Sequence, residues 1–124
     1  MIFTFYSYKG GVGRSMAMAH VAWELASRGL RVLAIDFDLE APGLERYFRV
    51  PVGEVLATPG VIDLIEAFKR SLSGSGGMAR DAEFRQLSRF IHRPVADFGH
   101  GGRLDLMPAG RRASDDDKIG RAHV

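Results

Sequence analysis

A glycine-rich loop between an apolar run and a helical pattern is the feature that most constrains this chain. Residues 8–15 read YKGGVGRS; they follow a β-branched and aromatic run at residues 2–6, which predicts a strand, and they precede an alanine-rich helical pattern at residues 15–28. Glycines let backbone N–H groups turn inward toward an anion, and the helix adds the positive end of its dipole. An ordinary turn needs one or two glycines and no fixed cations. Glycines, two basic residues and a hydroxyl in register therefore predict a phosphate-binding loop.

The loop departs from the usual phosphate loop, G-x-x-x-x-G-K-[ST], at two positions. Tyr8 replaces the first glycine and Arg14 replaces the lysine, whereas Gly13 and Ser15 keep their places, and a second cation, Lys9, precedes the glycine pair. A guanidinium stays charged and binds phosphate oxygens, but it is larger and aims differently from an ammonium. We expect this exchange to affect the rate of phosphoryl chemistry rather than binding.

Two aspartates follow the next strand pattern. Residues 31–35 read as a strand with a continuous apolar core, as expected for a central parallel strand covered on both faces, and Asp36 and Asp38 come at its carboxyl end. Open α/β sheets bind ligands at that end. Two aspartates two residues apart point to the same side, which suits one shared cation. In the alternative, one aspartate caps the following turn.

The remaining chain alternates helical and strand patterns, which predicts an α/β fold. The patterns predict a helical turn at residues 44–48, an amphipathic helix at 61–68, a flexible loop at 71–77, a helix at 81–90 and an edge strand at 91–95.

Composition sets broad limits. With 124 residues, 46% of them hydrophobic, the chain can build one modest domain. A net charge of +2 supports no claim of nucleic-acid binding, and the absence of cysteine excludes disulfides and cysteine-bound metals. Neither a signal peptide nor a membrane-spanning run is apparent, so a cytoplasmic location is expected.

The loop resembles the deviant Walker A motif of the ParA/MinD family of P-loop ATPases, whose loops read K-G-G-x-G-K-[ST]. This chain reads K-G-G-V-G-R-S and is similar to the family variant with arginine at the second basic position. Residues 31–38, reading RVLAIDFD, resemble the family's strand ending in D-x-D, and LEAPGL at residues 39–44 is typical of the arginine variant. The resemblance is strong over roughly the first fifty residues and weaker from there to Gly110. Within the weaker part, residues 103–110, reading RLDLMPAG, look like the family's next core strand, ending in its P-A-G turn. The resemblance implies a P-loop three-layer sandwich with a mostly parallel sheet, truncated before its later strands.

The resemblance also implies ATP and Mg²⁺ as cofactors and assigns residues to them. Ser15 would ligate the Mg²⁺, Asp36 would hold it through water, and Asp38 would orient the attacking water. In relatives the lysine at the position of Lys9 reaches across a dimer interface, so Lys9 and Asp38 are the candidate catalytic residues. The residues implied to contact nucleotide are Lys9, Gly10, Gly11, Val12, Gly13, Arg14, Ser15 and Met16.

The function implied for the intact parent is Mg²⁺-dependent ATP hydrolysis that drives a homodimerisation switch with an unknown effector. One alternative, favoured by Arg14, is a weakly hydrolysing nucleotide-binding module that regulates a fused or partner effector. Another is a relative of the tyrosine kinases that share such loops. Nothing within this segment indicates nucleic-acid or membrane binding.

The chain divides at residue 117. Residues 1–117 are interpreted as the N-terminal part of a P-loop ATPase domain. Residues 119–124 resemble a translated sequencing-adapter read, so 118–124 are interpreted as a non-native tail; a polar tail is the alternative. We expect a sheet with open edges, marginal stability and no ATPase activity for this piece alone.

Overall fold

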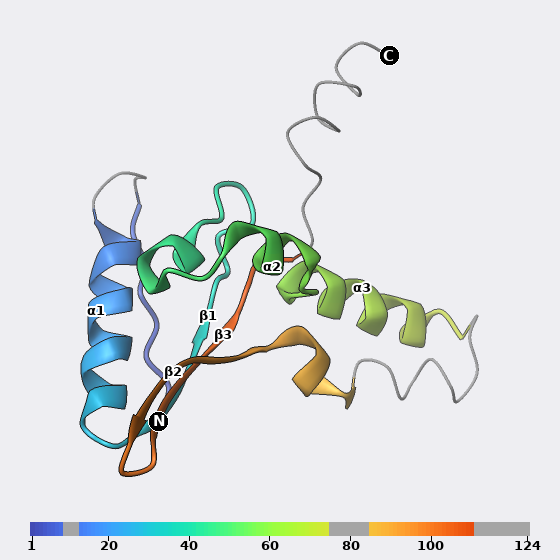
Figure 1. Cartoon of the computed structure of the whole chain (residues 1–124). Helices are drawn as coiled ribbons and strands as arrows, with labels where there is room; N and C mark the ends of the chain where they lie inside the picture. The colour runs from blue at the N-terminus through green and yellow to red at the C-terminus, as the bar shows by residue number, and fades with distance from the viewer. Residues whose placement is uncertain (9–12, 75–84, 111–124) are drawn as a thin grey trace.

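Helices cover both faces of a small sheet in this computed structural model, which describes residues 1–8, 13–74 and 85–110 (Figure 1). The sheet of the described residues has the order β1-β3-β2, with β1 and β3 parallel and β2 and β3 antiparallel. The predicted α/β class is confirmed. The elements are α1 (Arg14–Ser27), β1 (Arg31–Ile35), the 3-10 helix η1 (Leu44–Phe48), α2 (Val52–Ala57), α3 (Val61–Leu72), the 3-10 helix η2 (Leu87–Phe90), β2 (His92–Gly99) and β3 (Gly102–Met107).

The main core lies between α1 and the sheet. Alanines recur on the inner side of α1, and their small size lets the helix approach Leu104 and Leu106 of β3 closely; both leucines are fully buried. Because side chains alternate along a strand, Met107 faces the other side of the sheet, where it packs against Val61 of α3 and Phe90 of η2. Core residues on both faces explain the three-layer arrangement.

The turn after β3 anchors the start of α3. The carbonyl groups of Pro108 and Ala109 accept the first N–H groups of α3, from Val61 at 2.9 Å and Ile62 at 2.8 Å. These N–H groups have no acceptor within their own helix. A Cβ atom on Gly60 would lie 2.0 Å from the Pro108 carbonyl oxygen, so only glycine permits this approach. The predicted P-A-G turn is thus part of the packing between β3 and α3.

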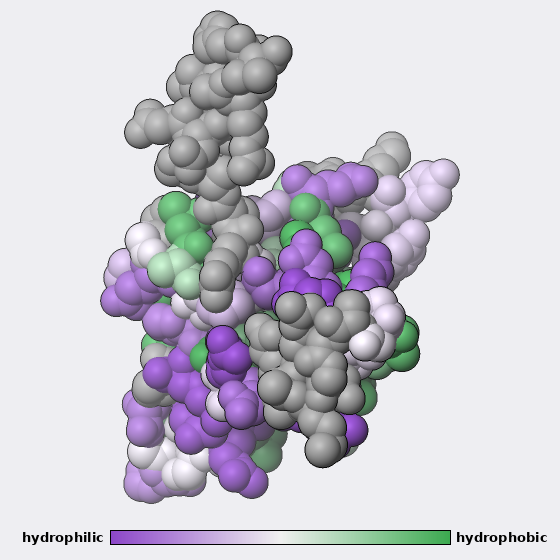
Figure 2. Space-filling view, turned by 90° about the vertical axis from the view of Figure 1, so that its right-hand side faces the viewer, coloured by the Kyte–Doolittle hydropathy of each residue, from purple (hydrophilic) through white to green (hydrophobic). Residues whose placement is uncertain are grey.

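A polar cluster occupies the sheet face opposite α1. Asp105 of β3 is 7% exposed and lies 3.1 Å from Arg103 and 3.7 Å from Arg93. Figure 2, which shows the molecule from its α3 side, displays a largely hydrophilic surface with separate hydrophobic groups. The buried apolar cluster described on this side of the sheet consists of Val61, Phe90 and Met107.

The strand predicted at residues 2–6 is not observed. Residues 1–8 contain no strand, and Met1, Ile2 and Tyr6 are largely exposed. Strand propensity produces a strand only where the run pairs with a neighbouring strand; β1 and β2 occupy both edges of β3, and residues 1–8 form no ladder with the outer edge of β1 or of β2. The prediction of β1 as a central strand was also wrong for the described residues, because β1 lies at one edge of the sheet and Leu33 is 43% exposed. An open edge of this kind was expected.

Other predictions have mixed outcomes. The helices expected at residues 15–28 and 61–68 and the turn at 44–48 are confirmed, and β2 is an edge strand as expected. α3 continues through Leu72, into the predicted loop, and the short α2 was not predicted. Of the helix predicted at 81–90, residues 81–84 lie outside the described part, and residues 87–90 form η2 instead. The tail at 118–124 also lies outside the described residues. No helix in the described part of the chain has the length and apolar character needed to cross a membrane.

Candidate phosphate-binding site

The helix after the glycine loop begins in a way that suits an anion. Gly13 adopts the left-handed conformation at φ 81°, which glycine reaches without steric penalty, and α1 starts at the next residue. The first N–H groups of a helix have no intrahelical acceptor, and the helix dipole makes this end positive. No acidic residue lies in the first turn of α1 to satisfy them. An external anion is the partner that this end favours.

Several predicted site residues share this helix start. Ser15 is the second residue of α1 and is half-buried, and the neighbouring Met16 is 49% exposed. Lys9, Gly10, Gly11 and Val12 lie outside the described residues. The roles of Ser15 and Met16 in metal and nucleotide binding stay predictions.

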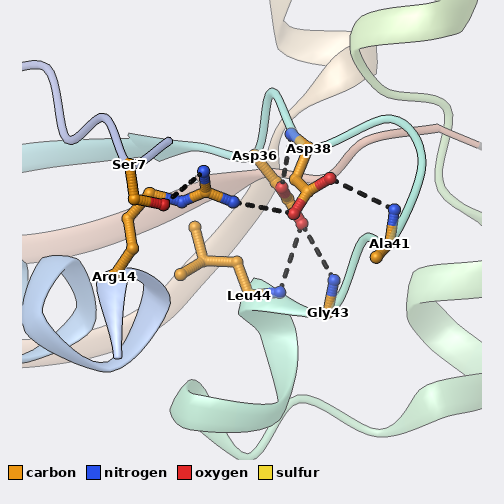
Figure 3. A network of polar contacts seen from close by, with 7 residues as sticks. All are labelled: Ser7, Arg14, Asp36, Asp38, Ala41, Gly43 and Leu44. Atoms are coloured by element: carbon orange, nitrogen blue, oxygen red, sulfur yellow. Dashed lines mark hydrogen bonds and ion pairs between the residues drawn. The ribbon is translucent and has the colours of Figure 1, made fainter. Parts of the chain in front are cut away.

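Asp36 is buried at the end of β1 and holds the following loop (Figure 3). Its Oδ2 atom accepts N–H groups from Gly43 and Leu44, each at 3.1 Å, and its Oδ1 atom accepts the N–H of Asp38 at 3.0 Å. The residue is 5% exposed. Three N–H donors compensate for the burial of the carboxylate. The turn-capping role raised as an alternative thus describes what Asp36 does in this structure.

Asp38 joins the loop to the start of α1. Its Oδ2 atom accepts an N–H of the Arg14 guanidinium at 2.8 Å, and its Oδ1 atom accepts the N–H of Ala41 at 3.1 Å. The Arg14 guanidinium also donates to Ser7 Oγ at 3.1 Å. Figure 3 shows Arg14 extending between Ser7 and Asp38. The structure therefore brings the loop arginine and the candidate catalytic aspartate into direct contact.

The residues present fit Mg²⁺ bound mainly by phosphate oxygens and water. A carboxylate offers about four acceptor positions, and Asp36 uses three of them for backbone N–H groups. The remaining position on Oδ1 suits a water-mediated contact. Within the described residues, no group of three or more His, Cys, Asp and Glu side chains could hold a metal. Mg²⁺ ordinarily keeps several waters and takes few protein ligands, so a site with few protein oxygens is compatible with it, and the roles of Ser15 and Asp36 in holding it stay predictions.

Sequence reasoning missed the contacts that build this site. Ser7 was not predicted to contact Arg14, although it is the polar residue that interrupts the apolar run before the loop. Gly43 and Leu44 supply N–H groups to Asp36, and the turn pattern Pro42-Gly43 was the available signal that the chain folds back there.

A separate open cleft of about 680 Å³ lies between α1 and η1. It contains no predicted site residue; its lining is formed by Ala19, His20, Trp23, Glu24, Tyr47, Phe48 and Arg49. The interpretation as a phosphate site therefore rests on the glycine loop and the D-x-D segment, not on this cleft.

Comparisons with known proteins identify the family of this chain. The family model described as the CobQ/CobB/MinD/ParA nucleotide binding domain matches residues 3–110. The septum site-determining protein MinD of Helicobacter pylori is 30% identical over 88 residues, which make up 71% of this chain and 31% of that protein. The chain thus matches less than a third of this relative's length. No solved structure matches the chain. The glycine loop, the D-x-D strand and the family match together show that the chain belongs to the CobQ/CobB/MinD/ParA family of nucleotide-binding domains.

Proposed function

We propose that this chain supplies the phosphate-binding half of an ATP-dependent molecular switch. The observation that carries the proposal is the ion pair between the start of α1 and the segment that follows β1. Arg14 Nη2 lies 2.8 Å from Asp38 Oδ2 in this pair. The ion pair brings Arg14, the residue that follows Gly13, next to the D-x-D segment, which is far from it in the sequence. Phosphoryl transfer depends on charge neutralisation and positioning, and these are the resources such a site offers.

The roles proposed for the residues follow from their places. Backbone N–H groups of residues 10–15 cradle the phosphates, and the Ser15 hydroxyl and a water on Asp36 hold Mg²⁺. When bound, Mg²⁺ neutralises phosphate charge. Asp38, in the same loop, accepts a hydrogen bond from the attacking water. Asp36 also keeps the segment from residue 38 to residue 44 in place through its N–H contacts.

The switch requires a second subunit. By its resemblance to the family, Lys9 reaches the phosphates bound by the partner subunit, so ATP links two copies and hydrolysis releases them. The effector that responds to this change is not identified by the described residues. A cytoplasmic location is part of the proposal.

A nucleotide-binding regulatory module with weak hydrolysis is the second candidate. The observation that favours it is again the Arg14 contact: the carboxylate of Asp38 is engaged by a guanidinium and by the N–H of Ala41. An aspartate held in this way is less available to orient water. Single-turnover hydrolysis distinguishes the candidates, because the switch needs turnover and the module needs only binding.

Replacing Ser15 by alanine tests the proposed site. In the natural protein that contains this chain, Ser15→Ala is expected to weaken ATP binding about tenfold or more when Mg²⁺ is present, because one oxygen ligand of the metal is lost. Binding in EDTA should change little. Ser27→Ala is the matched control, since Ser27 lies at the other end of α1 and its hydroxyl contacts only the Glu24 carbonyl oxygen among the described contacts. Calorimetric titration measures both affinities. Equal Mg²⁺ dependence in Ser15→Ala and wild type would contradict the proposed metal role.

A further inference from the structure

The loop arginine already has an anionic partner within the chain. The Arg14 guanidinium donates one N–H to Asp38 Oδ2 at 2.8 Å and another to Ser7 Oγ at 3.1 Å (Figure 3). Both side chains of the ion pair are about two-thirds buried, at 29% and 32% exposure. A charge-assisted contact of this length is among the stronger side-chain hydrogen bonds. Arg14 is therefore fixed in one direction rather than free in solvent.

A carboxylate and a phosphate group bind a guanidinium through the same N–H donors. Both present oxygen acceptors to its N–H groups, and an N–H that points at one cannot point at the other. Arg14 occupies the position where the usual phosphate loop has its phosphate-contacting lysine. In this structure, the N–H group nearest to Asp38 is committed to the carboxylate instead.

We propose that Asp38 competes with the nucleotide phosphates for Arg14, so that phosphate binding frees the Asp38 carboxylate. This inference rests on the proposed ATP binding and names Asp38 as an internal competitor of the ligand. The exchange breaks the ion pair at Oδ2, while Oδ1 keeps the Ala41 N–H and the Asp38 N–H keeps Asp36 Oδ1. The loop thus stays anchored when Arg14 leaves. The candidate catalytic group becomes available only in a subunit that has bound phosphate.

The competition predicts that removing Asp38 improves ATP binding. In wild type, ATP binding must break the ion pair between Arg14 and Asp38, which reduces the net affinity. For a partly exposed ion pair, the free energy of breaking it corresponds to about a threefold to fivefold loss of affinity. Asp38→Asn and Asp38→Ala are therefore expected to bind ATP about threefold to fivefold more tightly than wild type. A residue that only positions water would leave affinity unchanged.

The control must separate competition from simple charge repulsion. Glu40→Gln removes one negative charge from the same exposed loop, and Glu40 has no contact with Arg14 among the described residues. Its affinity for ATP is expected to stay within experimental error of wild type. In an Arg14→Gln background, Asp38→Asn is expected to give no gain, because there is no guanidinium left to release.

The pair can also be tested without nucleotide. In denaturant unfolding of the full natural protein, Arg14→Gln and Asp38→Asn should each lower stability, and the double variant should lose less than the sum of both. Additive losses would overturn the inference by showing that the pair does not form in solution.

Calorimetric titration with Mg²⁺ and ATP decides the competition. A gain for Asp38→Asn that is absent in Glu40→Gln and in the Arg14→Gln background supports it. Equal gains for Asp38→Asn and Glu40→Gln, or a gain that persists without Arg14, would overturn it while leaving ATP binding intact. Absence of ATP binding in wild type and all variants would instead refute the proposed function, and the competition with it.

Discussion

Replacing Asp36 by alanine is expected to destabilise the protein by about 3–4 kcal/mol, because the change removes a buried acceptor of three hydrogen bonds. The N–H groups of Asp38, Gly43 and Leu44 would lose their common partner. Gly43 and Leu44 lead directly into η1, whose Leu44 and Phe48 belong to the main core. The loss therefore extends from the loop into the packing against α1. Denaturant unfolding of the natural protein measures this loss of stability.

Asp97→Ala is the matched control for this variant. Asp97 is exposed and accepts one N–H group, from Gly99 at 3.0 Å. Its replacement is expected to lower stability by about 1 kcal/mol or less. Asp36→Asn should fall between the two, because the amide oxygen can still accept but the amide nitrogen cannot. Similar losses for Asp36→Ala and Asp97→Ala would show that the three contacts do not hold the loop.

Replacing Lys9 by alanine is expected to abolish ATP-induced dimerisation. A cation that crosses a subunit interface to phosphate is desolvated on binding, and removing one partner of such a pair costs about 2–5 kcal/mol, which corresponds to a weakening of the dimer by more than an order of magnitude. Light scattering in the presence of a non-hydrolysable ATP analogue measures the mass of the particle. Wild type should form dimers under these conditions, and Lys9→Ala should stay monomeric.

Lys69→Ala serves as the charge-matched control, because Lys69 is exposed in the last part of α3. It should dimerise like wild type. If Lys9→Ala still forms dimers that depend on nucleotide, Lys9 acts within its own subunit and the proposed switch loses its basis.

Local patterns predicted much of the fold. The bounds of α1 differ from the prediction by one residue at each end, because glycines at positions 13 and 29, both with positive φ, mark the helix on either side. The D-x-D segment could be located at the end of β1 because a short apolar run stops there. The P-A-G turn was located from its resemblance to the family.

Pairing and side-chain contacts could not be predicted in the same way. The run at residues 2–6 has the composition of a strand, but strand formation depends on a partner edge that the run itself does not specify. Likewise, the D-x-D pattern indicates two carboxylates on one side but not which donors they meet. Asp36 is occupied by N–H groups seven and eight residues ahead, and Asp38 by an arginine 24 residues before it. The Asp38 contact arises only when α1 packs beside the end of β1, and the Asp36 contacts arise only when residues 43 and 44 fold back onto that end.

Binding of nucleotide phosphates by the backbone of the glycine loop can be measured directly by hydrogen–deuterium exchange of the natural protein, with and without Mg²⁺ and ATP. An N–H group that donates a hydrogen bond to a phosphate oxygen exchanges more slowly. We expect strong protection in peptides that cover residues 9–16, and little change in peptides from α3, which lies across the sheet from α1. Equal exchange at residues 9–16 without nucleotide and at saturating nucleotide would refute phosphate binding by this loop.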